Sequence, residues 1–94
     1  MNTLKVTIQK SGLMRYYSQL DLVRILERAA RRTDLPFAFT QGFTPRLKIS
    51  FHNGLKLGVE GDILATFYFH EETSFVRLEE NLLPQLPHGL ILKP

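Results

Sequence analysis

Arginines that recur along one predicted helix are the side chains of this 94-residue chain best suited to chemistry. They lie within residues 19–33, opposite the apolar positions of the helix, and they are Arg24, Arg28, Arg31 and Arg32. Only Asp21 and Glu27 offer acidic partners at helical spacing. Unpaired guanidinium groups on one face favour anion binding, above all binding of RNA phosphate. The alternative is a helix face that is only solvated.

A second basic segment follows a turn signal. Gly42 and Pro45 predict a turn within residues 41–45, and the next residues alternate between apolar and polar side chains. The alternation predicts a strand over 47–51 with an apolar face and a cationic face. Together the two segments give the candidate binding residues, which are Arg24, Arg28, Arg31, Arg32, Gly42, Phe43, Arg46 and Lys48.

The sequence offers no convincing catalytic set. Its three histidines have no spacing typical of metal ligands, and the chain has no cysteine for a disulfide, a zinc thiolate site or an iron–sulfur cluster. Ser18 and Asp21 are better explained as the cap of a helix than as a nucleophile and its partner. We therefore expect no catalytic residue, no metal and no cofactor in this chain, and no enzyme activity of its own.

Charge is distributed unevenly along the chain. Residues 1–58 hold ten lysines and arginines against three acids, whereas residues 59–94 hold two against six, which gives the net charge of +3. The basic part favours a polyanionic partner, although an acidic protein surface would satisfy the same physics. No apolar run is long enough to span a bilayer, and the polar start does not resemble a signal peptide. We expect a cytoplasmic protein with no membrane partner.

The order of predicted elements indicates the fold. The pattern predicts strands around residues 4–8, 47–51, 63–69 and 90–92, helices over 19–33 and from 75 to Pro84, and a turn at Asn53-Gly54 before a short extended run at 55–57. This β-α-β-β-α-β order predicts a ferredoxin-like α+β sandwich, an antiparallel sheet with two helices on one face.

The other face of that sheet would be open. By alternation it carries Lys5, Thr7, Gln9, Arg46, Lys48, Ser50, Thr66, Tyr68 and His70. Such a face binds single-stranded RNA when aromatic side chains stack on bases, but here only Tyr68 is a convincing stacking residue. The arginines of the first helix would point away from this face, so one ligand reaches both only around an edge.

A long combined motif resembles a known bacterial family. It comprises Ser18-x-Leu20-Asp21-Leu22-x-Arg24, Glu27-Arg28-Ala29-x-Arg31-Arg32, Leu35-Pro36, Gln41-Gly42-Phe43-x-Pro45 and Lys48-Ile49-Ser50-Phe51. The chain resembles the radical-SAM-linked domain of unknown function, which is fused to or encoded beside radical SAM proteins. The resemblance implies that residues 1–94 form a single domain, the N-terminal half of a longer family domain.

The resemblance also implies a role. It suggests a non-catalytic accessory domain whose partner, a radical SAM protein, holds the iron–sulfur cluster and S-adenosylmethionine. Combined with the basic helix, it favours a domain that binds structured RNA, tRNA or rRNA, through the helix and the Gly42–Phe51 segment. The alternative is a protein-docking module that grips an acidic surface of the radical SAM partner without touching RNA.

Overall fold

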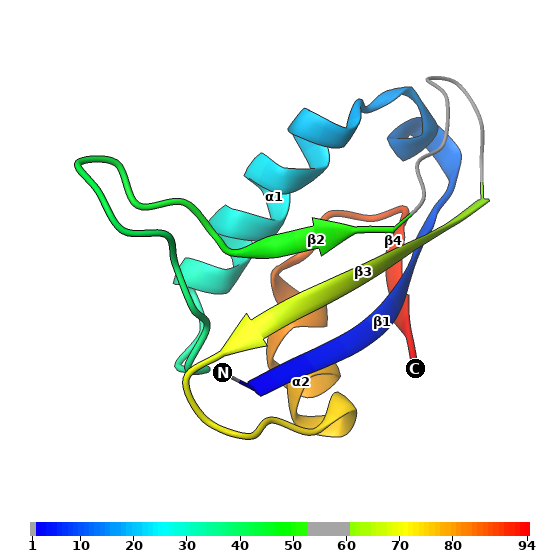
Figure 1. Ribbon diagram of the computed structural model, residues 1–94. Coiled ribbons are helices and arrows are strands. Elements are labelled where there is room, and N and C mark those ends of the chain that lie inside the picture. The colour runs from blue at the N-terminus through cyan, green and yellow to red at the C-terminus, as the bar shows by residue number, and fades with distance from the viewer. Residues whose placement is uncertain (1, 53–60) are drawn as a thin grey trace.

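The computed structural model describes residues 2–52 and 61–94, which form a mixed α+β arrangement (Figure 1). The described strands form one antiparallel sheet in the order β2-β3-β1-β4; they are β1 (Asn2–Lys10), β2 (Ile49–Phe51), β3 (Gly61–Phe69) and β4 (Leu90–Lys93). The helices are α1 (Gln19–Arg31) and α2 (Phe75–Leu82), accompanied by the 3-10 helices η1 (Gly12–Tyr16) and η2 (Leu83–Gln85). The predicted α+β class and antiparallel sheet are therefore confirmed.

The core is formed by one face of the sheet and the apolar sides of both helices. Val6 and Ile8 of β1 and Phe67 of β3 are buried in the same cluster as residues of α1 and α2, which are Leu22, Leu26, Leu78 and Leu82. Alternate residues of the strands point to the opposite face, as the sequence pattern predicts. We call that opposite face the open face of the sheet.

Local sequence signals set the starts of both helices. The Ser18 hydroxyl accepts a hydrogen bond from the Asp21 amide at 3.1 Å, and the Asp21 carboxylate accepts one from the Ser18 amide at 3.0 Å, so the predicted capping box is present. Backbone and side-chain hydrogen bonds from Ser18 lower the pKa of Asp21 below its ordinary value, and Arg24 adds to this effect. The cap is thus fully formed at neutral pH and is lost as the pH falls through that lowered pKa. Ser74 caps α2 in the same position.

The ends of elements differ from the sequence expectation in two places. Helix α1 ends at Arg31 rather than at residue 33, because the Thr33 hydroxyl binds the Ala30 carbonyl at 2.8 Å and tightens the last turn. The strand expected over 47–51 is paired with β3 only from Ile49 to Phe51, while Leu47 forms an isolated bridge with Phe39. The turn predicted at residues 53–54 and the run at 55–57 lie outside the described residues.

A buried lysine fixes the connection between β1 and α1. Lys10 is 1% exposed, and its Nζ donates a hydrogen bond of 2.9 Å to the carbonyl of Tyr17, just before α1. Helix η1 spans the intervening residues, and its start is held by the Ser11 amide, which donates to the Gly89 carbonyl at 2.9 Å. The buried Lys10 hydrogen bond therefore links the end of β1 to the residue that precedes the N-cap of α1.

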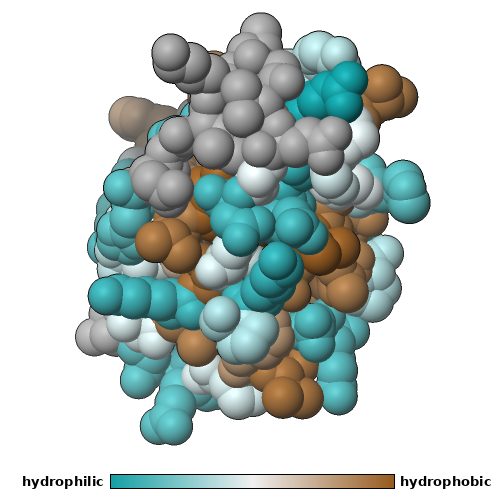
Figure 2. All heavy atoms as spheres, turned by 90° about the vertical axis from the view of Figure 1, so that its right-hand side faces the viewer, coloured by the Kyte–Doolittle hydropathy of each residue, from teal (hydrophilic) through white to brown (hydrophobic). Residues whose placement is uncertain are grey.

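The surface seen from the right-hand side of Figure 1 mixes polar and apolar side chains over short distances (Figure 2). In the described ranges 2–52 and 61–94, neither helix has the length and apolar character needed to cross a bilayer.

We predict that Lys10→Met destabilises the domain, because the Tyr17 carbonyl loses its internal donor while the aliphatic stem is kept. The expected loss in the free energy of unfolding is about 1–3 kcal/mol, measured by urea denaturation. The matched control is Lys5→Met, on the exposed side of the same strand, which should change stability by less than about 0.5 kcal/mol. Equal midpoints for the two variants would contradict a structural role of the Lys10 hydrogen bond.

Candidate nucleic-acid interface

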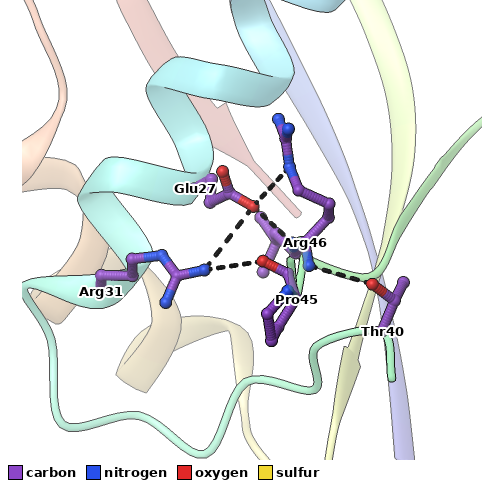
Figure 3. A network of polar contacts seen from close by, with 6 residues as sticks. Glu27, Arg31, Thr40, Pro45 and Arg46 are labelled. Atoms are coloured by element: carbon purple, nitrogen blue, oxygen red, sulfur yellow. Dashed lines mark hydrogen bonds and ion pairs between the residues drawn. The ribbon is translucent and has the colours of Figure 1, made fainter. Parts of the chain in front are cut away.

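One carboxylate oxygen of α1 organises the basic segment that precedes β2 (Figure 3). Glu27 Oε1 accepts a hydrogen bond from the Leu47 amide at 2.8 Å and another from Arg46 Nε at 3.1 Å. The same oxygen lies 3.9 Å from a terminal nitrogen of Arg31, one helical turn further along. The Glu27 side chain is only 14% exposed, whereas those of Arg31 and Arg46 are 51% and 43% exposed. The largely buried Glu27 side chain therefore links α1 to the segment at residues 46–47.

The segment closes into a loop that rests on Arg31. Thr40 and Arg46 exchange two hydrogen bonds at its base, from the Thr40 amide to the Arg46 carbonyl at 2.7 Å and from the Arg46 amide to the Thr40 hydroxyl at 3.0 Å. Arg31 donates to the Pro45 carbonyl at 2.9 Å, and its guanidinium carbon lies 4.6 Å from the centre of the Phe39 ring. We call residues 40–46 the projecting loop, since Figure 1 shows this segment extending away from the sheet.

The tip of the projecting loop is fully open to solvent. Gly42, in the segment for which the sequence predicts a turn, has a φ of 131°, a conformation that favours glycine. Phe43 follows with a relative exposure of 108%, the highest among the large apolar side chains that are described as exposed. An aromatic ring held outside the globule by a closed loop is suited to contact with a base or an apolar partner surface.

The remaining arginines of α1 are not tied down. Arg24, Arg28 and Arg32 are exposed, and among residues 2–52 and 61–94 no hydrogen bond or ion pair occupies their guanidinium groups. The two acids that the sequence offers as partners make their hydrogen bonds elsewhere, Asp21 with Ser18, and Glu27 with Leu47 and Arg46. Arg24 acts on Asp21 only through its charge. This face therefore keeps positive charge available for an anion.

The structure corrects the predicted placement of Arg46 on the open face of the sheet. Arg46 does not share the open face of the sheet with Lys48, because regular pairing starts only at Ile49 and Glu27 draws the Arg46 side chain toward α1. Lys48 does lie on the open face, with its Nζ 5.8 Å from the centre of the Tyr68 ring. Glu27 and Arg31 thus join the projecting loop to α1, the helix that also carries Arg24, Arg28 and Arg32, whereas Lys48 lies on the open face of the sheet.

Sequence reasoning missed the residues that hold this site together. Thr40, Phe39 and the Pro45 carbonyl fix Arg31 and Arg46. No motif marks Thr40 or Phe39, and Pro45 was singled out only as part of the turn signal and the family motif. From the sequence, Glu27 was recognised only as an acidic partner at helical spacing, although its shorter contacts are with residues 19 and 20 positions away. In the described part of the chain, no group of histidine, cysteine, aspartate or glutamate side chains is arranged to hold a metal ion.

Comparison with protein families places the chain. Residues 3–93 match the model of a family described as "uncharacterized protein conserved in bacteria (DUF2344)". The chain belongs to this family. Neither a curated protein nor a solved structure is significantly similar to it. The family description names no activity, ligand or partner, so the expected association with radical SAM proteins stays a proposal.

We predict that Glu27→Ala loosens the projecting loop, because the amide of buried Leu47 loses its acceptor. The free energy of unfolding should fall by about 1–3 kcal/mol, and hydrogen exchange at the Leu47 amide should become faster. Glu27→Gln keeps an acceptor oxygen and should cost less, since exposed ion pairs alone contribute at most about 1 kcal/mol. Glu80→Ala, at an exposed position of α2, is the control. Unchanged exchange at Leu47 in Glu27→Ala would show that the loop is held by other contacts.

Proposed function

We propose that this domain binds structured RNA, tRNA or rRNA, through the arginine face of α1 and the projecting loop. The observation that carries the proposal is the set of exposed arginines whose guanidinium groups make no hydrogen bond or ion pair within the described residues, Arg24, Arg28 and Arg32. Phosphate oxygens are the natural ligands of such a row, because each contact releases condensed counterions from the nucleic acid. The spacing along a helix face suits successive phosphates better than a single small anion.

The loop adds a different kind of contact to the same surface. Arg31 and Arg46 are held in place by Glu27 and Pro45, so their guanidinium groups meet a ligand with little further loss of side-chain freedom. Phe43 lies beyond them as an exposed ring that can stack on an unpaired base. This combination supports binding of a folded RNA, with its phosphates at the arginines of the helix and an unpaired base of one of its loops at Phe43.

The wider role that we propose is that of a non-catalytic accessory domain of a radical SAM system in the cytoplasm. On this proposal the partner protein supplies the iron–sulfur cluster and S-adenosylmethionine, and this domain presents the RNA. We also propose a ferredoxin-like layering of the fold, which the strand order β2-β3-β1-β4 supports.

We predict that affinity for tRNA falls steeply with salt, with a log–log slope of about −2 to −4 if three or four phosphates are engaged. Arg24→Gln combined with Arg28→Gln should flatten the slope by about one to two units and weaken binding similarly for different RNA sequences. Fluorescence anisotropy over a salt series measures both. The control is Arg77→Gln, an exposed arginine of α2, which should leave the slope unchanged.

The RNA proposal has a clear negative outcome. At about 0.1 M salt, where charges act over roughly 10 Å, the wild-type domain should bind tRNA or rRNA fragments at micromolar concentrations. Absence of binding to every such fragment under these conditions would rule the proposal out.

The exposed ring of Phe43 also favours a second candidate, a protein-docking module for the radical SAM partner. Exposed aromatic side chains and arginines are both enriched among binding hot spots between proteins. On this alternative, Phe43→Ser should abolish co-purification with the radical SAM partner while tRNA affinity stays as in the wild type. On the RNA proposal, the same substitution should lower tRNA affinity by about tenfold, because stacking of one base is lost.

A further inference from the structure

A hollow on the open face of the sheet lies apart from the arginine face and the projecting loop. It has a volume of about 370 Å³ and is lined by side chains that include Lys5 and Thr7 of β1, Leu64 of β3, and His52 at the end of β2. Small-molecule sites typically begin at about 300 Å³, so the hollow has room for one nucleobase with its sugar. It is open on one side, which suits a segment that passes over the sheet.

The hollow has a flat, partly apolar wall that is held in position. His52 Nε2 forms a hydrogen bond of 2.6 Å with the hydroxyl of Thr66, a residue that is only 5% exposed. The backbone amide of His52 donates to the Leu64 carbonyl at 2.9 Å, so both ends of the histidine are fixed to β3. The Leu64 side chain beside it is 49% exposed. A tethered imidazole next to an exposed leucine gives a planar base two surfaces to pack on.

Charge on the open face is predominantly positive. Lys5 lies in the hollow, directly across from Thr66 in the strand register, and Lys48 lies over the Tyr68 ring. Among the described residues of this face the acid is Asp62, and Lys93 stands 3.9 Å from its carboxylate. Lys5 therefore offers its ammonium group to a phosphate that enters with the base.

A second aromatic side chain continues the same surface. The Tyr68 hydroxyl is within 2.9 Å of Ser50 Oγ, which holds the phenol between β2 and β3. Along β3, Leu64, Thr66 and Tyr68 point to the same side, so the hollow and the tyrosine lie in one line. Lys48 lies beside Tyr68, and Lys5 and His52 both line the hollow, so a lysine and a ring are present at each of the two places.

We infer that the open face binds a single-stranded RNA segment, with one base in the hollow against His52 and Leu64 and its phosphate at Lys5. The next base stacks on Tyr68 beside Lys48. This inference rests on the proposed function, since it assigns the unpaired part of the same RNA to the sheet. The loop and the arginine face then hold the folded part, and the strand reaches the open face around the edge at β2.

The test is a titration of the isotope-labelled domain with a single-stranded RNA hexanucleotide, followed by NMR. Signals of the His52 ring and the Leu64 methyl groups should move, and Lys5→Gln should weaken the affinity by about fivefold or more. Lys93→Gln is the matched control, a lysine of the same face that stands beside Asp62, and should change the affinity by less than about twofold. Adenosine monophosphate, the second probe, should bind at least about tenfold more weakly, because it cannot reach Tyr68.

Variants of the arginine face separate this inference from the proposed function. The hexanucleotide should still shift His52 and Leu64 when Arg24 and Arg28 are both glutamine, although tRNA affinity has fallen. Shifts confined to α1 and the projecting loop would overturn the inference and leave the proposed function standing. Equal affinities for the monophosphate and the hexanucleotide would also overturn it, because the hollow would then be a site for free nucleotides.

Discussion

The Glu27 carboxylate is the interaction on which the arrangement of the basic site depends. A single oxygen meets a backbone amide and a guanidinium group from a segment far along the chain, and it does so from a largely buried position. The amide is the decisive partner, because a buried donor without an acceptor costs more than an exposed ion pair returns. Glu27 therefore has a structural role, and among the described residues it forms no ion pair with Arg24 or Arg28.

As a result, the same helix face carries one arginine that is held by contacts within the described part of the domain and others that are not. Arg31 is held against Pro45 and Phe39, whereas Arg24, Arg28 and Arg32 have exposed guanidinium groups that can follow a ligand. Fixed cations favour one geometry of the partner, and free cations contribute attraction at many geometries. The two sets belong to the same helix, and the projecting loop contacts that helix at Arg31.

Sequence patterns predicted the parts of this structure whose causes are local. The capping box of α1 and the alternation in β1 and β3 each depend on a few neighbouring residues, and all are present. The contacts that shape the site depend on pairs separated in sequence. The alternation of Arg46 with Lys48 suggested a shared face, but it gave no sign that Glu27 would take Arg46 to the other side. The burial of Lys10 could not be predicted either. A lysine at the end of an apolar strand looks like a surface residue until its acceptor, the Tyr17 carbonyl, is known.

The two hydrogen bonds between Thr40 and Arg46 close the projecting loop at its base and separate its tip from the rest of the fold. Both hydrogen bonds lie at the base, and the residues between them are exposed, so the core does not depend on the tip. The entropy of closing a loop grows only with the logarithm of its length. Residues 41–45 are therefore the place where this domain would tolerate a longer or foreign sequence, and where specificity for a partner could be exchanged without refolding the scaffold beneath it.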